Sequence, residues 1–182
     1  MSKVIAVLGG GNAGQASAAE LTLLGHECRL YQDPRFAGDM RLVLETGEIR
    51  LDADPKGGCR KTGLARIAKV TCDMAEAVKG AEIILCHLPA FAHANVAEEL
   101  AGLVEDGQVI VLLPGTLGTL VFVETFRRRG VTADVLFAET NTNSYDTRVI
   151  HPGKAYVYKM NAPLQIGVFP ACRTTEALEK LD

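Results

Sequence analysis

The sequence has no apolar stretch that approaches the roughly 20 residues needed to span a membrane. Its N-terminal residues also lack the separate charged and apolar regions of a secretory signal. Basic and acidic residues are interspersed and sum to a formal net charge of -3, so there is no basic stripe of the kind that binds nucleic acid. We therefore expect a cytoplasmic protein that engages neither a membrane nor nucleic acid.

Cysteine is present in an odd number, and no two cysteines have the C-x-x-C spacing of a redox or zinc motif. Several lie inside apolar runs, where cysteine usually behaves as a small buried hydrophobic residue. The five are Cys28, Cys59, Cys72, Cys86 and Cys172. This pattern predicts neither a disulfide framework nor a metal site.

The length of 182 residues, with 48% hydrophobic residues, fits one domain with a sizeable core. It is short for the two domains that most nicotinamide-dependent dehydrogenases need. We expect residues 1–171 to form a dinucleotide-binding domain. Residues 172–182 then read as the first turns of a helical substrate domain that this chain does not contain.

The strongest motif joins an apolar run over residues 4–8 directly to the glycine-rich segment 9–14. A strand that feeds a G-x-G-x-x-G turn places the pyrophosphate of a dinucleotide at a helix N-terminus. Gly9 permits the tight turn, Gly11 lets the backbone meet the pyrophosphate, and Gly14 allows close contact between helix and sheet. The alternative is a glycine-rich turn used only for packing. The predicted cofactor-binding residues here are Gly9, Gly11, Asn12, Ala13 and Gly14.

Along the rest of the chain, apolar strands alternate with amphipathic helices. After a helix over 13–24, a strand over 28–31 and a helix over 34–44, a polar segment over 47–63 predicts an inserted hairpin or edge strand. Further strands follow over 67–71, 82–88, 109–113 and 135–138, separated by helices over 74–79, 93–103 and 117–128. The pattern predicts an α/β fold of the Rossmann type, a doubly wound and mostly parallel sheet.

The last third of the sequence changes character. Segments 145–150, 156–160 and 164–169 resemble strands, and the short turns His151-Pro152-Gly153 and Asn161-Ala162-Pro163 lie between them. Such short connections exclude crossovers, so we expect antiparallel hairpins that close one edge of the sheet.

The choice between NAD and NADP should be made where the second strand ends. An acid normally found there hydrogen-bonds the ribose 2′-hydroxyl of NAD, but Gln32 holds that position and Asp33 follows it. Facing the ribose, Asp33 would repel a 2′-phosphate. If Asp33 instead caps the next helix, Arg35 is left to bind that phosphate. The residues admit both cofactors and slightly favour NAD.

Other candidate cofactor-binding residues follow later strands, at the carboxyl edge where ligands of open α/β sheets bind. The alternatives are turn geometry for the proline and glycine, and capping or surface roles for the polar residues. No Ser-His-Asp or Cys-His arrangement with a recognisable local signature is present, so no catalytic residue is assigned. The candidates are Leu88, Pro89, Ala90, His93, Pro114, Gly115, Glu139 and Thr140.

The order of several short motifs resembles the N-terminal domain of the octopine/nopaline (opine) dehydrogenases. These motifs are the glycine turn 9–12, the segment 108–115, Ala138-Glu139-Thr140, Arg148-Val149 and the segment 167–171. Individual motifs also occur in ketopantoate reductases and in 6-phosphogluconate and glycerol-3-phosphate dehydrogenases. The resemblance implies NAD(P)-dependent reductive condensation of an amino acid with an α-keto acid.

In that family the general acid/base histidine and its acidic partner belong to a helical C-terminal domain, and no segment of 1–182 matches that motif. The resemblance therefore implies that this chain holds the cofactor and needs a helical domain or subunit for turnover. Two alternatives stay open: the first domain of a ketopantoate-reductase-like or glycerol-3-phosphate-dehydrogenase-like enzyme, and a dinucleotide-binding module without chemistry of its own.

Overall fold

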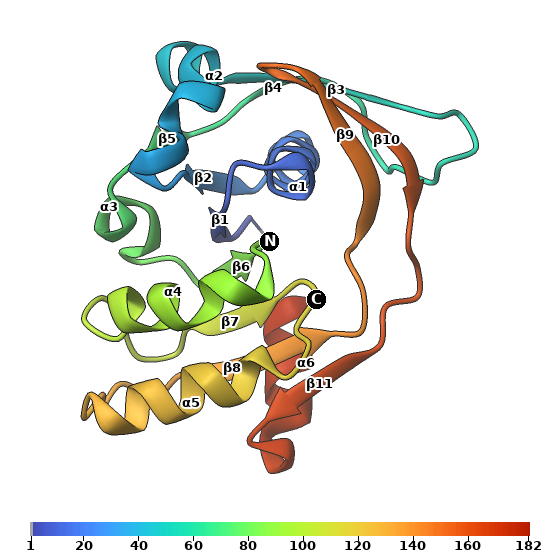
Figure 1. The fold of residues 1–182 in the computed structure, drawn as a ribbon. Coiled ribbons are helices and arrows are strands. Elements are labelled where there is room, and N and C mark those ends of the chain that lie inside the picture. Colours follow the sequence, from blue (N-terminus) through green and yellow to red (C-terminus); the bar gives the residue numbers. More distant parts are fainter. Residues whose placement is uncertain (1) are drawn as a thin grey trace.

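The computed structural model describes residues 2–182, which form a seven-stranded main sheet, a smaller second sheet and six α-helices (Figure 1). The main sheet has the order β5-β2-β1-β6-β7-β8-β11, in which β11 alone is antiparallel to its neighbour. Its strands are β1 (Val4–Leu8), β2 (Glu27–Tyr31), β5 (Lys69–Thr71), β6 (Ile83–Cys86), β7 (Val109–Leu112), β8 (Leu136–Thr140) and β11 (Ile166–Phe169). The predicted doubly wound, mostly parallel sheet with an antiparallel edge is confirmed.

Helices cover both faces of this sheet, with α3, α4 and α5 on one face and α1 on the other (Figure 1). The helices are α1 (Asn12–Leu24), α2 (Arg41–Thr46), α3 (Met74–Val78), α4 (His93–Leu100), α5 (Gly118–Arg128) and α6 (Thr174–Leu181). Short 3-10 helices span Pro34–Met40, Ala90–Ala92 and Ala171–Arg173. The single helix predicted over 34–44 is therefore wrong: a 3-10 helix precedes α2 there, and Gly38 within it disfavours a regular α-helix.

The central strands β1, β6 and β7 bury both of their faces, which explains their uninterrupted apolar sequences. In β1, Val7 joins the core on the α1 side, whereas Ala6 and Leu8 join the core beneath α3, α4 and α5. Strand β7 repeats this alternation, with Val111 on the first side and Ile110 on the second. Two apolar cores therefore lie on opposite sides of one sheet.

The second sheet is built from two insertions far apart in the chain. Its strands are β3 (Glu48–Ala53), β4 (Gly63–Arg66), β9 (Tyr145–His151) and β10 (Lys154–Met160), in the order β4-β3-β10-β9. The inserted hairpin predicted after residue 47 is confirmed as the antiparallel pair β3–β4. The β9–β10 hairpin also forms, but it does not close the main sheet: β10 pairs in parallel with β3 instead.

This departure has a physical reason in the packing of α1. Ala155 and Val157 of β10 are fully buried, as are Ile49 and Leu51 of β3, and all four join the core around α1. The second sheet arches over the outer side of α1 in Figure 1. An edge position on the main sheet would leave this apolar face exposed, so burial favours the separate sheet.

Because sheets lie on both sides of α1, its residues 14–20 are all buried, including Glu20, which is 2% exposed. Its Oε2 accepts a hydrogen bond from the hydroxyl of Tyr145 at 2.5 Å, and its Oε1 accepts one from the backbone N–H of Arg60 at 2.6 Å. A buried acceptor must be paired to be tolerated. Glu20 therefore connects α1 to β9 and to the loop that leaves β3.

The last helix, α6, packs against the domain that precedes it. Ala177 is fully buried in the core on the α1 side, and Lys180 Nζ donates a hydrogen bond to the carbonyl of Gly107 at 2.7 Å. Arg173 pairs with both Asp134 and Glu176. Leu178 stays 44% exposed. The boundary predicted at residue 172 stays a prediction.

The described residues include no helix long and apolar enough to cross a membrane. Within residues 2–182, no group of three or more metal-ligating side chains is arranged to hold an ion. Cys28 and Cys86 lie in the buried strands β2 and β6, and burial raises the pKa of their thiols to about 11 and about 12. These two cysteines therefore stay protonated and pack as apolar residues.

Candidate functional site

The turn between β1 and α1 is packed so closely that two of its glycines cannot carry a side chain. Gly9 has φ +102°, and a Cβ there would lie 2.7 Å from the carbonyl oxygen of His87. A Cβ on Gly14 would lie 1.7 Å from the carbonyl oxygen of Gly9. The first turn of α1 therefore sits directly on the end of β1.

Gly11 differs, because the position of its missing Cβ has no heavy atom within 4 Å. It is the N-cap of α1, where no side chain accepts from the helix N–H groups and no acidic residue lies in the first turn. Such an N-terminus presents N–H groups and the positive end of the helix dipole to an anion. The open face at Gly11 leaves room for an anion such as a diphosphate.

The side chain of Gln32 hydrogen-bonds the backbone of the glycine turn. This side chain is buried, and Oε1 accepts a hydrogen bond from the backbone N–H of Gly10 at 2.6 Å. Gln15 Nε2 donates to the carbonyl of Gly10 at 2.8 Å from the other side. Two buried side-chain amides therefore hold the glycine turn in place. Gln32 also lines the neighbouring cavity.

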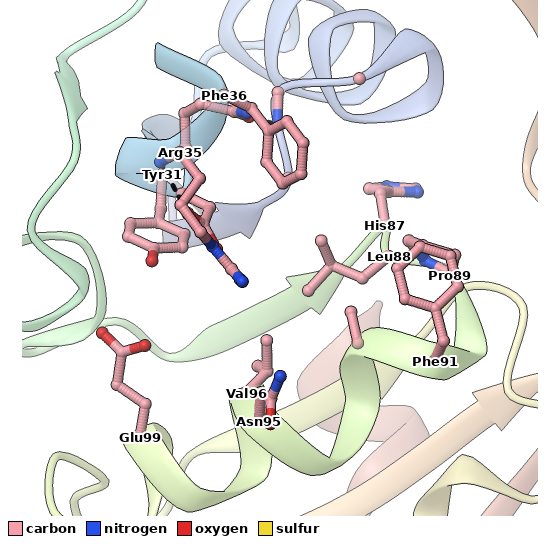
Figure 2. Close-up of a pocket in the computed structure, with 16 residues that line it drawn as sticks. Tyr31, Arg35, Phe36, His87, Leu88, Pro89, Phe91, Asn95, Val96 and Glu99 are labelled. Atoms are coloured by element: carbon pink, nitrogen blue, oxygen red, sulfur yellow. Dashed lines mark hydrogen bonds and ion pairs between the residues drawn. The ribbon is translucent and has the colours of Figure 1, made fainter.

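A cavity of about 340 Å³ lies beside the turn, at the carboxyl ends of β1, β2 and β6. Figure 2 shows residues that follow β2 on one side and residues of α4 on the other. Its lining includes Gly9, Gly10, Gly11, Tyr31, Gln32, Asp33, Arg35, Phe36, His87, Leu88, Pro89, Phe91, Asn95, Val96 and Glu99. Mostly apolar walls with a few polar groups are typical of small-molecule sites.

Asp33 and Arg35 form a close ion pair at this cavity. Asp33 Oδ1 accepts from the backbone N–H of Arg35 at 2.8 Å and so caps the 3-10 helix, and Oδ2 meets Arg35 Nη2 at 2.6 Å. Hydrogen bonds from Arg35 hold the pKa of Asp33 below its usual range. The sequence left open whether Asp33 faces the ribose or caps the next helix and frees Arg35. In the structure Asp33 caps the 3-10 helix and also forms an ion pair with Arg35.

A second cavity, of about 300 Å³, adjoins the first along the end of β6, where His87, Leu88 and Pro89 border both. The N-terminus of α1 and the free edge of β9 form its other walls. Its remaining lining residues are Asn12, Ala13, Leu113, Pro114, Asn143, Tyr145, Thr147 and Arg148. The glycine turn therefore stands between two connected cavities.

His87 is the titratable residue at the junction of these cavities. Both ring nitrogens are buried without a hydrogen-bond partner among the described residues, and burial lowers the pKa of the imidazole to about 4. The ring is therefore neutral near pH 7, with one nitrogen able to donate and the other to accept.

We expect His87 to make the free energy of unfolding depend on pH. The unfolded imidazole, with pKa 6.5, takes up a proton before the folded one does, so stability is full above pH 6.5 and falls as the pH drops to 4. The loss attributable to His87 is about 3 kcal/mol over this window. Urea unfolding near pH 7 and near pH 4 should show that His87→Gln lacks this portion, and an unchanged pH dependence in the variant would contradict it.

Glu139 and Thr140 end β8 next to a third cavity of about 400 Å³. Glu139 Oε2 accepts from the backbone N–H of Thr119 at 3.1 Å, near the start of α5. A Cβ on Gly115 would lie 2.1 Å from the Cβ of Glu139, so the loop after β7 presses on this side chain. Both residues belong to β8 and do not follow it as predicted. The hydroxyl of Thr140 donates to the carbonyl of Thr142 at 2.7 Å.

The structure does not bring every predicted residue to these cavities. His93 is 2% exposed and packs edge-to-face on Phe122, with ring centroids 6.0 Å apart, and against Gly118 of α5. Burial lowers its pKa. His93 therefore packs between α4 and α5, and Ala90 also lies outside the three cavities. A side chain at a helix start is not bound to face the cleft.

Sequence reasoning missed several residues of the site. Asn95 and Glu99 lie four apart on α4 and face the first cavity together, a spacing that the predicted helix already contained. Phe36 and Phe91 are exposed aromatic residues at its rim. The sequence marked the strand over 145–150 and the Arg148-Val149 motif but not their part in the site, because nothing local in the sequence places that strand beside the glycine turn.

Comparison with known proteins finds relatives that share the segment containing the glycine turn. Residues 4–118 match the protein family described as the N-terminus of NAD-dependent glycerol-3-phosphate dehydrogenase. The chain belongs to this family. It is also 33% identical over 181 residues to an opine dehydrogenase of Arthrobacter sp. (strain 1C), which covers 99% of this chain and 48% of that protein. The chain thus spans about half the length of this relative.

Solved structures show the same fold. Octopine dehydrogenase with NADH and L-arginine superposes with a TM-score of 0.79 at 23% identity, covering 91% of this chain and 41% of that one. Yersinopine dehydrogenase with NADP⁺ bound gives a TM-score of 0.77 at 19% identity, covering 98% and 46%. The predicted resemblance to the N-terminal domain of the opine dehydrogenases is confirmed: nearly the whole chain is similar to the Arthrobacter protein.

Proposed function

We propose that this chain binds NAD(H) as the cofactor-holding half of an enzyme that condenses an amino acid with an α-keto acid. One observation carries the proposal: the uncapped N-terminus of α1, open at Gly11, stands between two cavities that share His87 and Leu88. A dinucleotide is two nucleosides joined by a diphosphate, and this arrangement provides a place for each part.

The residues present fit the three parts of the cofactor. The first cavity, rimmed by Phe36 and Phe91, would receive the adenosine, and Asp33 would accept a hydrogen bond from its ribose. Asn12 and Ala13 open the helix that would hold the diphosphate, and the second cavity would receive the nicotinamide half. When bound, the cofactor supplies the hydride for reduction of an imine.

The charges at the first cavity favour NAD over NADP. A 2′-phosphate on the ribose would meet the ionised carboxylate of Asp33, whose low pKa keeps it charged. Arg35, the cation that would otherwise balance that phosphate, is already engaged by Asp33. Repulsion combined with an occupied partner disfavours the phosphorylated cofactor.

We expect the protein to bind NADH at least about tenfold more tightly than NADPH, a ratio within reach of a single charge contact. Replacing Asp33 by serine should shift the preference toward NADPH. Serine still caps the 3-10 helix, whereas Arg35 becomes available to the phosphate. Nicotinamide fluorescence titrations of both proteins with both cofactors measure the shift.

The preference for NADH and the existence of the dinucleotide site are tested by different outcomes of these titrations. Tighter binding of NADPH by the unaltered protein would contradict the charge argument and leave the dinucleotide site intact. Binding of neither cofactor would contradict the site itself. A matched variant, Arg41→Ser, removes an exposed arginine from a helix surface pair outside the cavity and should leave both affinities unchanged.

Proton donation and substrate selection would use residues outside this dinucleotide-binding domain. We propose that the proton donor and the groups that select the amino acid and α-keto acid belong to a helical domain or subunit, which α6 would begin at residues 172–182. A cytoplasmic location is part of the same proposal. Addition of a keto acid and an amino acid to this chain with NADH should therefore give no turnover until that second half is supplied.

Glycerol-3-phosphate dehydrogenase activity is the second candidate, favoured by the family match itself. That match ends at residue 118, before the β9–β10 hairpin that walls the second cavity. The similarity to the Arthrobacter opine dehydrogenase continues through this hairpin. The opine reaction therefore accounts for more of the site.

A further inference from the structure

The second cavity is lined by a positively charged side chain, Arg148, which does not belong to the glycine turn. Among the described residues that line this cavity, Arg148 is the only one with an ionised side chain, and no carboxylate lies there. None of the ion pairs between described residues includes Arg148. In the part of the chain that the structure describes, its guanidinium makes one hydrogen bond, from Nη1 to the carbonyl of Thr147 at 2.8 Å.

The position of Arg148 follows from the edge of the second sheet. Strand β9 ends that sheet, so one side of it has no neighbouring strand. The backbone N–H of Val149 leaves this free edge and donates to Asn12 Oδ1 at 2.8 Å, at the first residue of α1. Backbone groups two residues apart point to the same side of a strand, so the carbonyl of Thr147 and the guanidinium upon it lie at this edge too.

Three features at this place point to an anionic ligand. The α1 N-terminus has no side-chain cap and no acidic residue in its first turn. His87 contributes two buried ring nitrogens that have no hydrogen-bond partner within residues 2–182. Arg148 adds a full positive charge whose present partner is one neutral carbonyl. A guanidinium exchanges such a contact readily for a phosphate, to which it can donate two parallel hydrogen bonds.

We propose that Arg148 is a further cofactor-binding residue, supplied by the second sheet, whose guanidinium pairs with the diphosphate of the dinucleotide over the N-terminus of α1. This inference rests on the proposed function and deepens it. The helix N-terminus alone offers partial charges, and a diphosphate carries two full negative charges. The second sheet therefore contributes to cofactor affinity as well as covering α1.

The test compares Arg148→Gln, Arg148→Lys and the unaltered protein in NADH titrations at low and high salt. We expect Arg148→Gln to weaken NADH binding about tenfold and to make the affinity less sensitive to salt, because one charge contact is gone. Lysine keeps the charge without the bidentate geometry, so Arg148→Lys should fall between. Adenosine has no phosphate, so its own dissociation constant, derived from competition with NADH, should be the same for each protein.

Arg66→Gln is the matched control, because Arg66 is an exposed arginine of the same sheet, on β4, outside the cavity. It should bind NADH as the unaltered protein does. Equal NADH affinity in Arg148→Gln and the unaltered protein would overturn the role of Arg148 and leave the dinucleotide site standing. If the unaltered protein binds no NADH, the cofactor site and this inference both fall. Unfolding curves of each variant establish that the fold is retained.

Discussion

Replacing Gly14 by alanine is expected to lower the free energy of unfolding by about 3 kcal/mol and to abolish measurable NADH binding. The new Cβ would stand 1.7 Å from the carbonyl oxygen of Gly9, a backbone atom that cannot move aside without opening the turn. Relief requires α1 to lift from β1, which disturbs the buried core on that side of the sheet. The same movement displaces the helix N-terminus from the cofactor.

Gly11→Ala is the matched control, since the same methyl group is added three residues earlier in the same turn. Gly11 has φ -73° and no heavy atom within 4 Å of the added carbon. Stability should stay within about 0.5 kcal/mol, whereas NADH binding should weaken because the methyl occupies the approach of the diphosphate. Urea unfolding and NADH titration separate the two variants. A Gly14→Ala protein as stable as Gly11→Ala would contradict the close contact.

Replacing Glu20 by alanine is expected to cost about 3 kcal/mol of unfolding free energy, because part-buried donors lose their acceptor and a cavity is left. The hydroxyl of Tyr145 and the N–H of Arg60 both point at this carboxylate. Tyr145 also borders the second cavity. The loss should therefore loosen β9 beside the cofactor site, and NADH binding should weaken along with stability.

Tyr145→Phe removes one of these hydrogen bonds and keeps the ring, so it should cost about 1 kcal/mol. Burial, followed by the nearby Glu20, raises the pKa of Tyr145, so the hydroxyl is a donor at neutral pH. Urea unfolding of the two single variants and the double variant gives their coupling. Additive losses would mean that Glu20 and Tyr145 stabilise the fold independently, contrary to the structure.

Much of the fold could be predicted because its signals are local. The glycine turn, the buried strand β6 and the following α4 each lie within a dozen residues, and their periods of apolar residues reveal them directly. A parallel sheet follows from alternating strands and helices with few possible arrangements. Strand β11 was expected in a hairpin with the strand before it, because their connection is short. It lies at an antiparallel edge of the main sheet, but its partner is β8.

The pairing of distant insertions gave no such signal. Strand β3 meets β10 about a hundred residues later in the chain, and the parallel register of Leu51 with Ala155 depends on the shape of α1 between the sheets. The sequence indicated strands in both segments, and their apolar alternation was correct. It could not indicate which strand each would join, because either arrangement satisfies the same local pattern.

The candidate site likewise combines features that the local sequence predicts with features that depend on tertiary contacts. The sequence by itself determined the glycine turn, the α/β order and the family resemblance, since these depend on neighbouring residues and on short connections. Only the tertiary structure decided that Gln32 supports the turn, that Asp33 engages Arg35, that His93 is buried and that Arg148 borders the cleft. Each of these depends on which side chains meet across space, and that is fixed by the packing of the whole chain.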